Sequence, residues 1–297
     1  MIYLLLTILV NVFIFLNFRA YTKFGVDTLQ AIVFNYFACV ITGLLFLTGK
    51  QPIETFMQGG AWVYVGIGLG VIFIATFYLM ALTTQKVGVS VASVASKMSL
   101  TIPVVFSLFF LDIEKKEMDA LNYAGIVLAL IAIFLTSVKR RKGETRQPGN
   151  WRSMIMPVSV FLLSGLIDTT INYTNLQYLD GKSEAVFPIV IFMVAGLVGF
   201  AGVLVTRRKI GIKSIIGGIT LGVPNYFSIY FLIKALSAFD NNGAILYPML
   251  NIGIIIISSL LAVVLFREHL RPVNKAGIAL AVLAIILLSH QEILAAL

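Results

Sequence analysis

The charged residue deepest inside an apolar segment of this chain is Lys97. It stands ten residues into a 25-residue apolar run, Val87 to Leu111, about 15 Å along a helix. An ammonium at that depth costs about 2.5–3.5 kcal/mol against lipid and must therefore face protein, water or a ligand. The spacings 3, 4 and 4 put one polar stripe on one helix face, made of Ser90, Ser93, Lys97 and Thr101. This stripe predicts either a cavity for a substrate or proton, or an ammonium buried for packing alone.

Two acidic residues are candidates for proton coupling, Asp168 and Glu268. Asp168 lies well inside an apolar run, and its repeat at spacing four with Ser164 and Asn172 predicts a second polar stripe. It is the expected countercharge of Lys97, although a position four residues from the end of its run also suits a carboxylate that reaches interface water. Glu268 is expected in a short turn between two apolar runs.

Aromatic and amide side chains supply a third polar face. Tyr226 and Tyr230 lie four residues apart beside Pro224, and Pro248 bends another apolar run that carries polar side chains. Kinked helices leave carbonyl groups that water-lined cavities satisfy, so such segments suit a binding site. The alternative for each tyrosine is a buried ring or a membrane-interface residue. The predicted substrate-binding residues are Lys97, Ser93, Tyr78, Asn225, Tyr226, Tyr230, Tyr247 and Asn251.

Redox, metal and nucleotide chemistry find little support. Cys39 is the single cysteine, and His269 and His290 are the two histidines, too few for a disulfide framework or a metal site. The glycines at 66–70 and 218–222 follow no strand and precede no lysine, so they are expected to pack helices rather than hold phosphate. The sequence contains neither a G-x-S-x-G turn nor a pair of acidic residues inside the membrane, and their absence argues against an enzyme. We expect no catalytic residue and no cofactor.

The segments that position these residues are membrane helices. Apolar residues make up 59% of the 297 residues and charged residues 12%, and the mean hydropathy is +0.99, which excludes a soluble domain. Unbroken apolar runs indicate helices and not the strands of a membrane barrel. Ten spans are predicted, at Met1 to Phe18, Thr28 to Thr48, Ala61 to Thr83, Val87 to Leu111, Ala120 to Val138, Ser153 to Asn172, Ala185 to Thr206, Ser214 to Leu236, Asn242 to Phe266 and Val273 to His290.

A basic linker divides the spans five and five. The linker, 139–152, contains six basic residues and separates a first repeat, 1–138, from a second, 153–297. A shift of 152 residues aligns Asn122 to Ser137 with Asn274 to Ser289, with ten identities in sixteen positions. Because five is odd, the second repeat must enter the membrane in the opposite orientation, which is the plan of inverted-repeat transporters. The predicted fold is all-α, with ten transmembrane helices as two inverted five-helix repeats.

With these features the chain resembles the EamA-like family of the drug/metabolite transporter (DMT) superfamily. The resemblance rests on the five-plus-five spans, the G-I-x-L-A-x-x-A-I pattern of spans five and ten, Pro248, and the turn Phe266 to Leu270. It implies a multi-pass transporter of small metabolites, with Glu268 at the family's acidic turn position. In the first repeat the equivalent position is Lys116, between Glu114 and Glu117, which departs from that pattern.

The net charge of +9 indicates how the chain is oriented in the membrane and not that it binds nucleic acid. Sixteen basic residues lie in one set of alternating loops and adjoining helix ends, and five lie in the other set. The positive-inside rule predicts the first set in the cytoplasm and both termini outside, whereas many ten-span relatives in the superfamily have cytoplasmic termini.

The sequence therefore predicts a secondary transporter of a small organic solute in the cell inner membrane, working by alternating access. An amino acid, an organic acid or a related metabolite is the expected solute, and the resemblance favours export. The alternative is a lipid or lipid-carrier flippase of the same fold, and a membrane-embedded enzyme is a remote third. The expected partners are the solute and the lipid bilayer, without nucleic acid, and the oligomeric state, monomer or homodimer, is left open.

Overall fold

A computed structural model of the chain describes residues 2–46, 51–103, 119–137, 152–179, 183–205, 209–238 and 243–295. Within these ranges every element is a helix. In the first part of the chain the helices are α1 (Ile2–Phe24), α2 (Thr28–Phe46), α3 (Gln51–Gln58), α4 (Ala61–Lys86), α5 (Val89–Met98) and α7 (Ala120–Ser137). In the second part they are α8 (Arg152–Tyr178), α9 (Ser183–Val205), α10 (Ile212–Ala238), α11 (Gly243–Phe266), α12 (Pro272–Leu288) and α13 (His290–Ala295).

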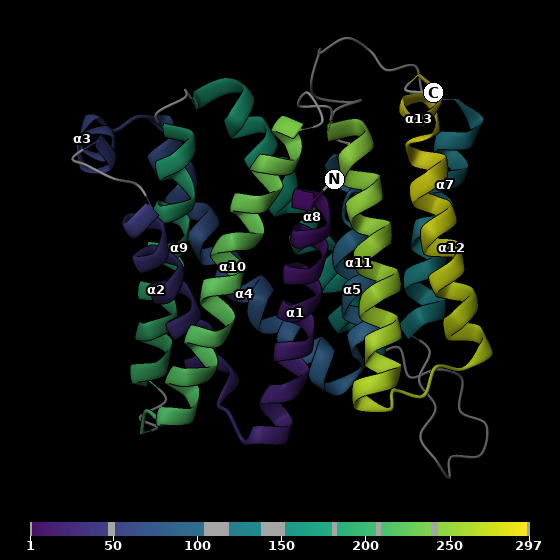
Figure 1. Ribbon diagram of the computed structural model, residues 1–297, viewed down its shortest axis with the longest axis horizontal. Coiled ribbons are helices and arrows are strands. Elements are labelled where there is room, and N and C mark those ends of the chain that lie inside the picture. The colour runs from purple at the N-terminus through teal and green to yellow at the C-terminus, as the bar shows by residue number, and fades with distance from the viewer. Residues whose placement is uncertain are drawn as a thin grey trace.

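The long helices form one bundle (Figure 1), with both termini and α3 toward the same end. Eight helices in the described ranges are long and apolar enough to cross a membrane, namely α1, α2, α4, α7, α8, α9, α10 and α11. Helix α12, with 17 residues, is slightly shorter. The chain is therefore a helical membrane protein.

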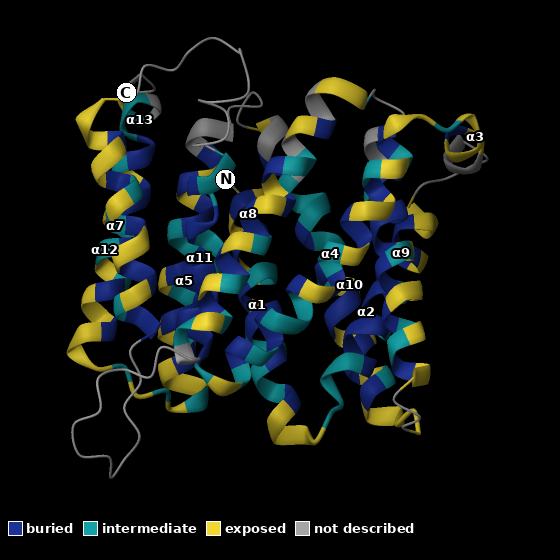
Figure 2. Ribbon diagram, turned by 180° about the vertical axis from the view of Figure 1, so that it is seen from behind, coloured by how far each residue is buried: buried dark blue, intermediate teal, exposed yellow. Residues whose placement is uncertain are grey.

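The surface of the bundle is apolar. Leu45, Val205 and Val264 expose 74%, 82% and 63% of their surface, which a soluble protein would bury. In Figure 2 the buried residues line the contacts between helices and the exposed ones face outward. This pattern suits a bundle whose outer face meets lipid rather than water.

Several predicted spans differ from the observed helices at their ends. The first span was expected to end at Phe18, but α1 continues to Phe24, because the polar residues that follow Phe18 lie on the last turns of a continuous helix. The predicted span Val87 to Leu111 is represented by the short helix α5 and a turn at residues 99–100, and residues 104–111 lie outside the described ranges. The linker 139–152 likewise lies outside them except for Arg152, as do Glu114, Lys116 and Glu117.

Glycines bring two pairs of helices into backbone contact, as the sequence predicted. A Cβ on Gly70 of α4 would lie 2.6 Å from the Val194 Cβ of α9. A Cβ on Gly218 of α10 would lie 2.7 Å from the Ala31 carbonyl oxygen of α2. Both distances are too short for a side chain, so each glycine is required by the close approach of its partner helix.

Helices α7 and α12 form an antiparallel pair with its own polar contacts. The Asn122 Nδ2 at the start of α7 donates to the Leu288 carbonyl at 3.1 Å, and the Asn274 Nδ2 at the start of α12 donates to the Thr136 carbonyl at 2.9 Å. Each asparagine thus satisfies carbonyl groups that the end of the partner helix leaves free. In Figure 1 the pair forms one edge of the bundle.

Candidate functional site

The polar core of the bundle is built around α5, which packs against α1, α4, α7, α8 and α11. Helix α5 begins after Gly88 and ends at Met98, and a turn at Ser99 and Leu100 separates it from the helical residues 101–103. Because the helix is interrupted, residues on either side of the turn present side chains in directions that a straight helix would not allow.

Lys97 lies in the last turn of α5 and faces α1. Its side chain is half-buried, and its Nζ lies 3.5 Å from the Asn11 Oδ1, at the long limit of a hydrogen bond. Asn11 also donates its Nδ2 to the Thr7 carbonyl of its own helix at 2.9 Å, which fixes the amide with its oxygen toward the lysine. The ammonium therefore has one weak partner and two unused donor positions among the described residues.

Asp168 of α8 faces the same region from the opposite side. The Ser99 Oγ donates to the Asp168 Oδ2 at 3.0 Å, and the carboxylate interacts electrostatically with the Lys97 ammonium. Among the described residues, however, no nitrogen–oxygen distance of 4 Å or less joins Lys97 to Asp168. The two charges are neighbours without being a closed ion pair.

Asp168 is surrounded by protein atoms and still keeps an exposed surface. A tight contact holds this face in place, since Ile102, just beyond the turn, packs directly on Gly165, one turn before Asp168.

Tyr247 of α11 completes the group. It exposes 36% of its surface and interacts electrostatically with Asp168. Asn251, one turn further along α11, is 7% exposed, and Ser93 of α5 is fully buried and donates its Oγ to the Ser90 carbonyl at 3.0 Å. We define the central polar group as Asn11, Lys97, Ser99, Asp168 and Tyr247.

Three predicted residues of α10 lie elsewhere, against α2. The Asn225 Nδ2 donates to the Asn35 Oδ1 at 3.2 Å, so this amide joins two helices. The rings of Tyr226 and Tyr230 both pack on Phe46, with centroid distances of 5.8 and 5.9 Å. These contacts form a cluster of partly exposed aromatic rings, because Phe46 exposes 51% of its surface.

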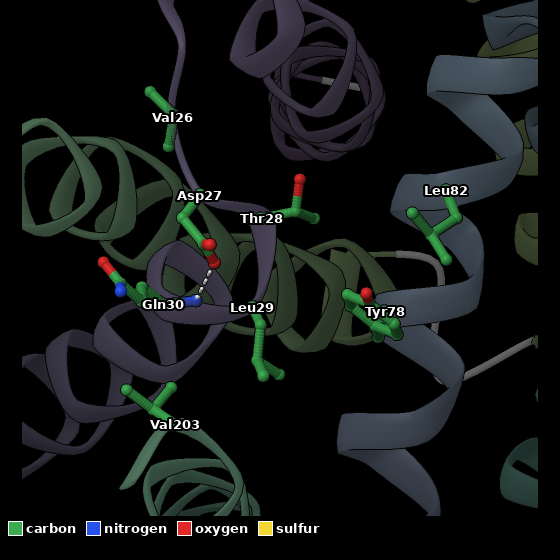
Figure 3. A pocket seen from close by; sticks show the side chains of 8 residues that line it. All are labelled: Val26, Asp27, Thr28, Leu29, Gln30, Tyr78, Leu82 and Val203. Atoms are coloured by element: carbon green, nitrogen blue, oxygen red, sulfur yellow. Dashed lines mark hydrogen bonds between the residues drawn. The ribbon is translucent and has the colours of Figure 1, made fainter. Parts of the chain in front are cut away.

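Tyr78 lines a separate cavity of about 330 Å³ between α2, α4 and α9 (Figure 3). The Asp27 side chain accepts the Gln30 backbone N–H at 3.1 Å, which caps the start of α2 beside the cavity. The dashed line in Figure 3 marks this hydrogen bond. The lining consists of Val26, Asp27, Thr28, Leu29, Gln30, Tyr78, Leu82 and Val203. None of these residues belongs to the central polar group.

Glu268 lies in the turn between α11 and α12 and contacts the beginning of α5. Its Oε2 accepts the Val89 N–H at 3.0 Å. Burial raises the pKa of Glu268 above its ordinary value, although the Val89 N–H and the nearby Arg19 favour the carboxylate. Glu268 thus lies at a helix end, about two turns from Lys97 along α5.

Two members of the central polar group were not predicted as site residues. From the sequence alone, Asn11 predicts an ordinary interhelical hydrogen bond, because a single amide in an apolar run does not indicate which way its side chain points. Ser99 is two residues from Lys97 and would point away from it on a continuous helix. Ser99 has a helical backbone conformation, with φ = −55° and ψ = −22°, so its hydroxyl reaches Asp168 from a face of α5 other than the one that carries Lys97.

Comparisons with known proteins show similarity along nearly the whole chain. No family model matches it. A protein of Haemophilus influenzae, described as uncharacterized, is 26% identical over 297 residues, covering 97% of this chain and 98% of its own length. A protein of known crystal structure has a similar fold, with a TM-score of 0.54, 13% identity and 95% coverage of both chains.

Proposed function

We propose that the protein is a secondary transporter that binds a small organic solute at the central polar group and moves it by alternating access. The observation that carries this proposal is the separation of Lys97 and Asp168. Two opposite charges inside an apolar bundle, near each other but not paired, leave a position that a polar solute can fill. A purely structural pair would be expected to close, because an open one keeps the desolvation cost without the full attraction.

An inverted repeat would give such a site two halves that move relative to each other. Helix contacts agree with this plan under the shift of 152 residues. Helix α1 packs on α10 and α11, and α8, its equivalent in the second repeat, packs on α4 and α5, the equivalents of those partners. The resemblance to EamA-like transporters supports ten spans arranged in this way in the inner membrane.

The chemistry of the group favours a zwitterionic solute over a simple organic anion. A carboxylate on the solute would pair with Lys97, and an ammonium group on the same solute would pair with Asp168. An organic acid would satisfy only the lysine and would bring a second negative charge toward Asp168. We therefore propose α-amino acids or closely related zwitterions as the substrate class.

Asp168 is also the group best suited to carry a coupled proton. The Ser99 Oγ lies 2.6 Å from the Ser96 carbonyl and 3.0 Å from the Asp168 Oδ2, and it has one proton to donate. When Asp168 is ionised, these two acceptors compete for that proton. When Asp168 is protonated, it donates to Ser99, which donates to the carbonyl, so both groups are satisfied.

Purified protein in liposomes tests the proposal. We expect counterflow of radiolabelled α-amino acids across the liposome membrane, absent from empty liposomes and strongly reduced in Lys97→Met. Fluorescent-lipid scrambling without amino acid counterflow would instead identify a flippase. Conversion of the amino acids to a new product would identify an enzyme. Either result would overturn the transport proposal.

A further inference from the structure

The turn between α4 and α5 is held from both sides by charged residues that lie far away in the sequence. On one side, the Arg19 guanidinium of α1 donates to the carbonyl oxygens of Thr84 and Gln85 at the end of α4. On the other, the Glu268 carboxylate accepts the Val89 N–H at the start of α5. A cation at a helix C-terminus and an anion at a helix N-terminus both stabilise the free backbone groups and the helix dipoles there.

The backbone on both sides of this contact is adapted to it. Gly88 has φ = 148°, a conformation that other residues rarely adopt, and a Cβ there would collide with the Glu268 carboxylate. Arg267, which precedes Glu268, has φ = 51°, and among the described residues it is the one non-glycine residue with positive φ. A left-handed residue is common directly after the end of a helix, and Arg267 follows the last residue of α11. The conformation at Arg267 ends α11, where the Glu268 N–H donates to the Ala262 carbonyl at 3.1 Å, and it leaves the Glu268 side chain against the start of α5.

Further hydrogen bonds tie the end of α4 to the neighbouring helices. The Gln85 Nε2 donates to the Phe18 carbonyl of α1 at 3.1 Å and to the Thr28 Oγ1 of α2 at 2.9 Å. Arg19 and Glu268 also attract each other electrostatically. The α4–α5 turn is therefore connected to α1, α2 and the α11–α12 turn, all at the end of the bundle opposite the termini (Figure 1).

We propose that the contact of Glu268 with the N-terminus of α5 is a gate that closes this end of the bundle, and that it must break when the solute site opens to this side. The inference rests on the proposed transport function. It joins the α11–α12 turn, in the second predicted repeat, to α5 in the first, across 179 residues of sequence. Alternating access requires the two repeats to separate at one end while they close at the other.

The position of Lys97 on α5 explains why this contact matters to the central polar group. Lys97 lies eight residues from Val89 on the same short helix. A movement that frees the first turn of α5 from Glu268 would therefore also move the ammonium relative to Asp168 on α8. Opening of the gate and weakening of solute binding would then be linked through one helix.

Cysteine accessibility measures the gate without any solute. In the full chain, with Cys39→Ser as background, Ala92→Cys places a thiol one turn inside α5, where Ala92 is fully buried. The protein is embedded in lipid nanodiscs, and the rate of alkylation by a charged maleimide is measured. We expect Glu268→Ala to raise the rate about five- to thirtyfold, the range for loss of a helix cap worth about 1–2 kcal/mol. Glu268→Gln, which keeps an acceptor but loses the charge, should give a smaller increase.

The matched control is His269→Ala, since His269 is the exposed neighbour of Glu268. An unchanged rate in Glu268→Ala, or an equal increase in His269→Ala, would overturn the gate. If Glu268→Ala does not fold, the alkylation rate in Glu268→Gln and a cross-linking experiment test the gate instead. A cleavable cross-linker between Val87→Cys and His269→Cys should stop counterflow of α-amino acids reversibly while equilibrium binding persists, and undiminished counterflow would refute the gate.

The two proposals fail in different ways. Faster alkylation in Glu268→Ala with no counterflow of any amino acid in the wild-type protein would leave the gate standing and remove the transport function. Normal counterflow in the wild-type protein, with no change of the alkylation rate in Glu268→Ala, would support the transport function and remove the gate.

Discussion

Asn122 and Asn274 are reciprocal partners. Each lies in the first turn of its helix, and each donates its side-chain amide to the last carbonyl groups of the helix that carries the other. The Asn122 Nδ2 donates to the carbonyls of Leu287 and Leu288, and the Asn274 Nδ2 to those of Leu135 and Thr136. Donors and acceptors are both related by 152 residues, the shift that aligns the two halves of the sequence.

This reciprocity predicts equal effects of two substitutions. Asn122→Ala and Asn274→Ala should each lower the free energy of unfolding by about 1–2 kcal/mol, since each loses hydrogen bonds of about 0.6–1.7 kcal/mol in a membrane bundle. Reversible unfolding in mixed micelles measures both, with the exposed Lys275→Ala as the control. A large loss in one variant and none in the other would contradict the equivalence of the two contacts.

Lys97→Met should abolish solute binding while the protein stays folded. Methionine keeps an unbranched chain of similar length, and an apolar residue often replaces a buried ion without loss of stability. Lys97→Arg retains the charge with a larger planar group and should keep partial activity. Thermal stability and amino acid affinity in detergent separate the two roles. Well-folded Lys97→Met with wild-type affinity would rule out a role in binding, and an aggregated variant would point to a structural ammonium.

Asp168→Asn should uncouple transport from protons. The amide can still accept the Ser99 hydroxyl, but it no longer binds and releases a proton. We expect accumulation of solute under a pH gradient to disappear, while exchange of labelled for unlabelled solute continues. Normal accumulation by Asp168→Asn would assign the proton to another group, with Glu268 next in order, and loss of both activities would indicate a binding role.

The contact of Asp119 with His290 of α13 should weaken as the pH falls. Although burial opposes it, the hydrogen bonds from the Asn122 and Leu121 backbone N–H groups and the contact with His290 hold the pKa of Asp119 below its ordinary value. The stabilisation is therefore complete at neutral pH and is lost as the pH falls through the lowered pKa. His290 lies 2.8 Å from the carboxylate. Wild type should be more stable than Asp119→Asn at pH 7, and the difference should shrink toward pH 3. A difference independent of pH would refute this assignment.

The basic residues predict how the chain is oriented in the membrane. Sixteen of them lie on the side of the linker and five on the other side, so the positive-inside rule predicts the termini outside the cytoplasm. A cytoplasm-dependent fluorescent reporter fused to the C-terminus should stay dark, and a bright membrane-localised fusion would reverse the prediction. Gln at Arg140, Arg141 and Lys142 should weaken the preference, because the linker carries six of the sixteen charges.

The sequence predicted the helical membrane class and several of the polar contacts, for physical reasons. An apolar run long enough to span a bilayer has few alternatives to a helix, and a lysine in its middle must meet a polar partner. Lys97 and Asp168 were expected to be opposed, and the structure brings them into electrostatic contact. Glycines at fixed spacing indicated close helix contacts, which Gly70 and Gly218 make.

The direction in which a side chain points was harder to predict than its depth in the membrane. Tyr226 and Tyr230 occupy the face of α10 that meets Phe46, because ring packing depends on the neighbouring helix rather than on spacing within one helix. The approach of Glu268 to α5 depends on the positive φ of Arg267, which composition does not encode. The contact of Ser99 with Asp168 lies on a face of α5 outside the predicted polar stripe, which spacing from Lys97 alone does not reveal.

The glycine contacts divide the bundle into parts that can slide and parts that cannot. Gly218 lies directly against α2, and Gly70 lies directly against the Val194 side chain of α9, so neither interface leaves room between the helices. Shear along these two interfaces would therefore cause steric collisions. The interfaces of α5 with α8 and α11 instead contain side chains that can change rotamer, including those of Lys97 and Asp168. Relative displacement of helices is therefore easier at the interfaces of α5 with α8 and α11 than at the α2–α10 and α4–α9 interfaces.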